Sequence, residues 1–187
     1  MGTIRAFLNR CVATVLLITF GATTANADAT EDRIAALQAK FRCPIFEYLV
    51  ALHDTSPKLK DRYLVAEINT KERYFTQCIF YNKDRKMHCE AESPYYDRSV
   101  SSYFTPERLA ILKSLGYTTK PSKNNFHLER KVTGVESLYE IAGLYVDTLA
   151  RVFDMQIYET LNYIAPRVPL KPSGSPETQR FCQPKLS

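Results

Sequence analysis

The sequence predicts an α+β domain in which helices pack against a twisted antiparallel sheet, with elements in the order α-β-β-β-α-β-β-α. Two observations carry this prediction. Residues 31–53 and 135–153 space their apolar side chains as helices do, whereas residues 62–92 alternate and are rich in β-branched and aromatic residues. The length of 187 residues fits one domain, which we place at residues 28–165.

The first 27 residues have the layout of a secretory signal peptide. Arg5 and Arg10 form a basic region, an apolar stretch runs from Cys11 to Ala22, and an A-x-A cleavage pattern ends at Ala27. The apolar stretch is short for a membrane span, although an uncleaved anchor is the alternative. We expect cleavage near Ala27 and a periplasmic or secreted chain that meets the membrane only through its export signal.

Composition excludes several classes of function. The chain carries a net charge of +5, and residues 1–27 contain two arginines and no acidic residue, so the mature chain keeps +3. This mild charge does not favour nucleic acid as a partner. The six glycines form no phosphate-binding loop, and His53, His88 and His127 lack metal-ligand spacing. We therefore predict no cofactor, no metal site, no catalytic residue and no enzymatic activity.

Four cysteines follow the predicted leader: Cys43, Cys78, Cys89 and Cys182. A hairpin made of residues 74–81 and 86–92 pairs positions that sum to 167, whether its loop has two residues or four. Cys78 and Cys89 then lie opposite each other, within disulfide distance. Cys43 is left to pair with Cys182. The alternative is four reduced, buried thiols.

The elements follow from local signals along the chain. Residues 31–53 form the first helical region, where Pro44 is expected to end one helix or begin the next. A polar linker precedes a strand at 62–68, and the hairpin follows it.

The second half continues with a loop at 93–103. Thr105 and Pro106 then give the N-cap and first turn of a helix that Gly116 ends. Short strands are expected at 117–120 and 125–132, before the helix at 135–153. Residues 166–187 contain four prolines before Cys182 and are expected to form an irregular tail.

The hairpin and its surroundings resemble the YbjN-like proteins of the TY-Chap group. The resemblance covers about residues 60–155 and includes Tyr74-Phe75-Thr76-Gln77-Cys78-Ile79-Phe80, Cys89-Glu90-Ala91-Glu92-Ser93, Phe104-Thr105-Pro106-Glu107, Leu115-Gly116-Tyr117 and Asn124-Asn125-Phe126-His127-Leu128-Glu129-Arg130, together with a final helix at 141–153. It implies the fold of class I type III secretion chaperones, which is often dimeric and allows a homodimer here. The signal peptide, cysteines and tail depart from the family.

Hairpin alternation separates a core face from an outer face. The predicted outer face holds Phe75, Ile79 and Tyr81 among polar residues, and such a mixed surface is typical of recognition. Tyr95 and Tyr96 in the following loop are candidate aromatic anchors for a partner. The alternative is that another helix or the tail covers the outer face.

These features predict an exported, non-enzymatic, chaperone-like domain that binds a protein or peptide client through its sheet face. The chaperone activity is a fold-level analogy. A second hypothesis is a small periplasmic inhibitor of a cell-wall enzyme that presents residues 93–103, or a hydrolase that joins His88 or His127 to carboxylates from elsewhere.

Overall fold

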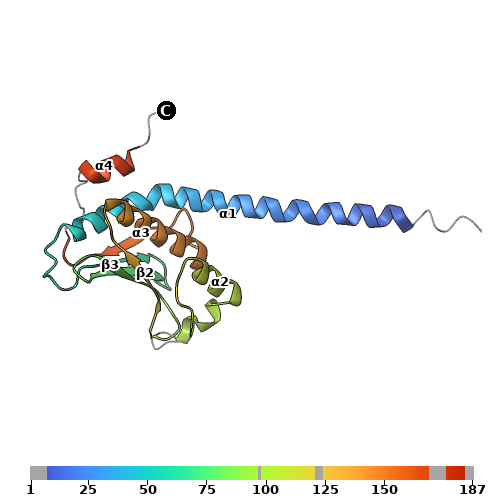
Figure 1. Cartoon of the computed structure of the whole chain (residues 1–187). Helices are drawn as coiled ribbons and strands as arrows, with labels where there is room; N and C mark the ends of the chain where they lie inside the picture. The colour runs from blue at the N-terminus through green and yellow to red at the C-terminus, as the bar shows by residue number, and fades with distance from the viewer. Residues whose placement is uncertain (1–7, 97, 121–123, 169–175, 184–187) are drawn as a thin grey trace, which may run out of the picture.

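The computed structural model describes the backbone of residues 8–96, 98–120, 124–168 and 176–183, with side chains for all of these except 8–27, 99 and 177. The predicted signal peptide, residues 1–27, therefore lies outside the described side chains. The rest confirms the predicted α+β class, with a five-stranded antiparallel sheet and helices (Figure 1).

The sheet has the strand order β4-β3-β2-β1-β5, and every neighbouring pair is antiparallel. Its strands are β1 (Tyr63–Ile68), β2 (Phe75–Tyr81), β3 (Lys86–Ala91), β4 (Phe126–Lys131) and β5 (Leu161–Ile164). Burial alternates along β1, β2 and β3, as expected for strands with one face on a core.

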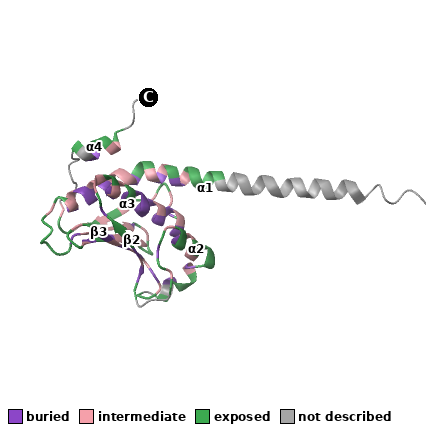
Figure 2. Ribbon diagram, in the orientation of Figure 1, coloured by how far each residue is buried: buried purple, intermediate pink, exposed green. Residues whose placement is uncertain are grey.

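The helices lie on one side of this sheet. They are α1 (Leu8–His53), α2 (Pro106–Ser114), α3 (Val135–Asp147) and α4 (Pro176–Cys182), with a 3-10 helix η1 (Arg98–Tyr103) and a π-helical turn η2 (Thr148–Val152). In Figure 1, α1 and α3 run above the sheet, and α4 lies on the side of α1 away from it. Buried residues concentrate where α1, α3 and the sheet meet (Figure 2).

The hairpin register is as predicted. Cys78 pairs with Cys89 and Ile79 with His88, and the last pair, Tyr81 with Lys86, leaves a four-residue loop. Three consecutive loop residues, Asn82–Asp84, have positive φ angles. The two-residue loop is thus excluded, while the pairing of the cysteines is unchanged because both loops share one register.

The prediction that Pro44 interrupts the first helical region was wrong. Pro44 lies inside α1, which continues to His53. Proline removes one backbone hydrogen bond from a helix and crowds the preceding turn. Here Phe41, Ile45 and Phe46 bury their side chains on both sides of Pro44, and the free energy of that burial outweighs the local cost.

Five strands were predicted and five are present, but one was misplaced. Residues 117–120 contribute only an isolated bridge, between Thr118 and His127, and the fifth strand is β5, which follows α3 and pairs with β1. The only local sequence signal for β5 is a short alternation of apolar and polar residues before Pro166. The pairing of β5 with β1 joins residues almost a hundred positions apart.

The predicted irregular tail contains a helix. Residues 169–175 and 184–187 of the tail lie outside the described residues, but Pro176 begins α4, which ends at Cys182. The disulfide between Cys43 and Cys182 joins α4 to α1. Phe181 packs edge-on against Phe46, with ring centroids 5.4 Å apart. Covalent attachment and this contact order a segment whose sequence alone indicates a loop.

Arg62 links the helix layer to the sheet and was not recognised in the sequence. It is 3% exposed, and its Nη2 donates to the carbonyl oxygens of Leu52 at 2.7 Å and His53 at 3.1 Å, at the end of α1. Its Nη1 forms an ion pair with Asp84 in the hairpin loop. One guanidinium thereby satisfies helix carbonyls that have no partner within the helix and holds the β2–β3 loop beside them.

Replacing Pro44 with Ala should stabilise the protein. The change restores the amide missing from α1, so we expect the free energy of unfolding to rise by about 1–3 kcal/mol, measured by urea denaturation. Pro57→Ala in the exposed linker is the matched control, because there the loss of proline should lower stability by about 0.4–1 kcal/mol. Equal effects at both positions would contradict this account of α1.

Replacing Arg62 with Leu should destabilise the protein strongly. The variant keeps some apolar volume but removes the ion pair with Asp84 and the guanidinium donors to the Leu52 and His53 carbonyls, so we expect a loss of about 3–5 kcal/mol in unfolding free energy. Arg167→Leu, which removes an exposed ion pair with Asp61, should change stability by about 1 kcal/mol or less. Similar losses of unfolding free energy in both variants would contradict the role of Arg62 in joining the helix layer to the sheet.

Candidate functional site

The outer face of the sheet is the candidate functional site. Strand register places Tyr63 beside Ile79, Val65 beside Ile164, and Glu67 beside Phe75 on this face. The residues between them, such as Leu64 and Cys78, are buried on the opposite face, where the helices lie. In the part of the chain that the structure describes, no helix packs over the outer face (Figure 1).

One half of this face is apolar. Ile79 is 38% exposed and Ile164 is 47% exposed, while the other apolar residues around them are half-buried by their cross-strand neighbours. We call the set the outer patch; it consists of Tyr63, Val65, Phe75, Ile79, Tyr81 and Ile164. Contiguous apolar residues on an open surface indicate a place of interaction.

The other half is polar and centres on Glu90. Its carboxylate accepts a hydrogen bond from Gln77 Nε2 at 2.6 Å and another from Asn125 Nδ2 at 3.4 Å. His88 Nε2 lies 3.3 Å from the same carboxylate, and the His88 ring stacks on His127 with centroids 5.5 Å apart. These contacts fix the polar side chains in place beside the outer patch.

The edge of this polar half carries an ion pair. Lys86 Nζ lies 2.8 Å from the carboxylate of Glu129. The hydrogen bond between them lowers the pKa of Glu129 and raises that of Lys86, so both groups stay charged near neutral pH. The outer face therefore offers a partner an apolar half next to fixed hydrogen-bonding and charged groups.

The structure brings together the histidines and a carboxylate that the sequence left apart, but on an open strand surface. His88, Glu90 and His127 come from adjacent strands β3 and β4. Among the described residues, no group of three or more potential ligands could hold a metal ion. The arrangement places hydrogen-bond donors and acceptors on the outer face of the sheet.

The predicted partner-binding residues fall into two groups. Phe75, Ile79 and Tyr81 project from β2 onto the outer face, as expected, with Ile79 the most open of the three. Tyr95 and Tyr96 lie in the loop after β3 and are 47% and 69% exposed. Their rings meet edge to face at 4.8 Å.

Other residues of the outer patch were missed in the sequence. Tyr63 and Val65 alternate with buried Leu64 and Ala66 along β1, and this alternation could have indicated their direction. Ile164 could not have been assigned, because its strand was not predicted and its neighbour Val65 is distant in sequence.

The two predicted disulfides are confirmed. The Cα atoms of Cys43 and Cys182 lie 5.7 Å apart, and those of Cys78 and Cys89 lie 4.0 Å apart. Such bonds are typical of proteins in oxidising, extracytoplasmic compartments. Among the helical residues whose side chains are described, no segment is long and apolar enough to cross a membrane.

Comparisons of the chain with family models, curated proteins and solved structures give no significant match. The YbjN-like resemblance therefore stays a prediction, and the candidate site rests on its own geometry.

Removing the longer disulfide should loosen the tail and lower stability. The bond between Cys43 and Cys182 spans 139 residues, so we expect the Cys43→Ser, Cys182→Ser double variant to lose about 2–4 kcal/mol of unfolding free energy. Hydrogen exchange should accelerate in residues 176–182 and stay slow in β1–β3.

Peptide mapping of the oxidised protein without reduction provides the check on this pairing. It should return the two cross-linked pairs described above. A peptide that links Cys43 to Cys78 or Cys89 would contradict the register of the hairpin.

Proposed function

We propose that the chain is an exported, non-enzymatic, chaperone-like domain that binds an apolar segment of a protein client on the outer face of its sheet. The exported state rests on the predicted signal peptide and agrees with an oxidising environment for the two disulfides. The observation that carries the binding proposal is the outer patch, in which Ile79 and Ile164 are exposed and the other residues are half-buried, although the helices of the chain bury the opposite face of the same sheet.

The chemistry of the outer patch suits a protein segment with apolar side chains. The exposed isoleucines Ile79 and Ile164 offer area that a partner can remove from water, and burial of apolar area is the main favourable term in association. Tyr63 adds an aromatic ring with a polar tip, and Tyr81 adds an aromatic ring whose hydroxyl is buried; aromatic residues are enriched in the centres of interfaces.

The polar half of the face supports orientation of the bound segment. Glu90 and Gln77 are held by their mutual hydrogen bond, and Lys86 with Glu129 places both signs of charge at one border. Charged and polar groups at the rim of an apolar patch favour one orientation of a partner over others. A homodimer formed through the same face would compete with the client.

A second candidate function is inhibition of a cell-wall enzyme by residues 93–103. The observation in its favour is the exposed pair Tyr95 and Tyr96, which are aromatic anchors on a loop. Lysozyme activity measured with the wild-type chain and with a Tyr95→Ala, Tyr96→Ala double variant separates this function from client binding on the sheet.

The client-binding proposal is tested by suppression of light scattering from an aggregating model protein. We expect the wild-type chain to suppress aggregation and the Phe75→Ala, Ile79→Ala double variant to lose the effect, with an apparent affinity about 30-fold weaker. This corresponds to about 2 kcal/mol for two truncated apolar contacts. Both positions are at least partly exposed, so thermal unfolding should stay within a few degrees of the wild type.

Tyr158→Ala is the matched control, because Tyr158 is 83% exposed and lies outside the outer patch. Its suppression of aggregation should equal that of the wild type. No suppression by the wild type, or equal losses in the control and the double variant, would refute binding through the outer face.

A further inference from the structure

We propose that a cavity behind the loop after β3 binds a small apolar carboxylate. The cavity has a volume of about 370 Å³, within the range of small-molecule sites. It lies between that loop, α2 and the start of β4, on the helix side of the sheet, because Phe126 in its wall is buried opposite Ala91. It is therefore separate from the outer patch.

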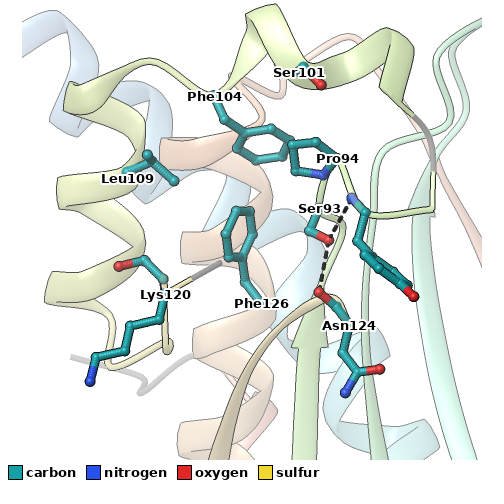
Figure 3. Close-up of a pocket in the computed structure, with 10 residues that line it drawn as sticks. Ser93, Pro94, Ser101, Phe104, Leu109, Lys120, Asn124 and Phe126 are labelled. Carbon is teal, nitrogen blue, oxygen red and sulfur yellow. Dashed lines mark hydrogen bonds between the residues drawn. The ribbon is translucent and has the colours of Figure 1, made fainter. Parts of the chain in front are cut away.

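The walls of the cavity are mainly apolar (Figure 3). Phe104 and Phe126 meet edge to face with centroids 5.1 Å apart, and Pro94, Tyr95 and Leu109 complete the apolar lining. Water beside such walls finds few hydrogen-bond partners, so an apolar group that displaces it gains free energy. The interior thus favours an aromatic or branched aliphatic group.

Hydrogen bonds hold the cavity open. Ser93 Oγ donates to the carbonyl oxygen of Asn124 at 3.1 Å, and the amide of Tyr95 donates to Ser93 Oγ at 3.3 Å (Figure 3). The Tyr96 hydroxyl donates to Asn124 Oδ1 at 3.4 Å. These hydrogen bonds join the loop after β3 to the segment before β4, so they fix the relative position of two walls of the cavity.

The rim determines the charge of the ligand. Lys120 is the one charged residue that lines the described part of the cavity, and the other polar residues there, such as Ser101 and Thr119, are neutral. In Figure 3 the Lys120 side chain extends away from the aromatic rings. A ligand with its apolar end between the rings would present its polar end to the rim, where an ammonium group favours a carboxylate.

The volume sets the size of the ligand. At about 30 Å³ for each atom of water size, the cavity holds about twelve non-hydrogen atoms. The carboxylate has two sources with the same chemistry: a free aromatic or branched acid, or the C-terminus of a peptide that ends in an apolar residue.

Isothermal titration of the oxidised protein with three matched probes tests this site. We expect 4-phenylbutyrate to bind with a Kd of about 0.1–1 mM, given the affinity available to a ligand of this size. The alcohol 4-phenylbutanol should bind about two- to fivefold more weakly because it lacks the ion pair, and the difference is small because one exposed ion pair contributes little. The cation 4-phenylbutylamine should bind more weakly still.

Variants locate the binding. Lys120→Gln should weaken phenylbutyrate to the level of the alcohol and leave the alcohol unchanged, whereas Lys113→Gln, an exposed lysine of α2 outside the cavity lining, should change neither. Ser101→Phe should fill the cavity and abolish binding of all three probes. If Ser101→Phe does not fold, the charge series with Lys120→Gln still decides the question.

A peptide pair distinguishes the sources. If peptide termini are the ligand, a tripeptide ending in Phe with a free carboxylate should bind more tightly than its C-terminal amide, and Lys120→Gln should remove that difference. If phenylbutyrate binds and the tripeptide does not, the site is assigned to free acids. Absence of saturable binding of both carboxylates at 10 mM, equal affinity for the three phenylbutyl probes, or no effect of Lys120→Gln would overturn the proposal.

Discussion

The attachment of the helix layer to the sheet depends on the buried guanidinium of Arg62. It donates to the last carbonyls of α1 and pairs with Asp84, while its own backbone oxygen accepts the amide of Phe80 from β2. A buried charge is costly unless it is paired and hydrogen-bonded, and here the partners of the guanidinium come from the end of α1 and from the hairpin loop. The end of α1, the start of β1 and the hairpin loop are therefore held in one relative position.

This attachment accounts for the one-sided architecture that leaves the candidate site open. Once α1 and α3 cover one face of the sheet, every second residue of β1, β2 and β3 is buried, and the residues between them face outward. Because the disulfide of Cys78 and Cys89 lies on the buried face, it strengthens the hairpin without occupying the candidate site. Ile79 and Ile164 on the outward face lie outside the buried core of the described residues, and this supports the proposal that they bind a partner.

Local patterns were enough to predict the hairpin and its cysteine pair, because strand parity and register depend only on neighbouring residues. They were also enough for α2, where Thr105 caps the helix and Gly116 follows its end with a φ of 96°. The passage of α1 through Pro44 and the strand β5 could not be predicted in this way, because both depend on packing against distant segments. The same holds for Arg62, which a strand pattern describes as one more polar residue, and for Asn125 and His127, which meet Glu90 from the side of β4.

The outer face and the cavity would recognise different ligands, because one is an open sheet surface and the other a small apolar cavity. The outer patch is an open part of the sheet face bordered by Lys86 and Glu129, which suits contact with a protein surface. The cavity is small and lined by Phe104 and Phe126, which suits a single apolar group whose affinity comes from fit. β3 carries His88 on the outer face, and the residues that follow it enter the cavity wall at Ser93. The two sites lie on opposite faces of the sheet, so a ligand in the cavity leaves the outer face free.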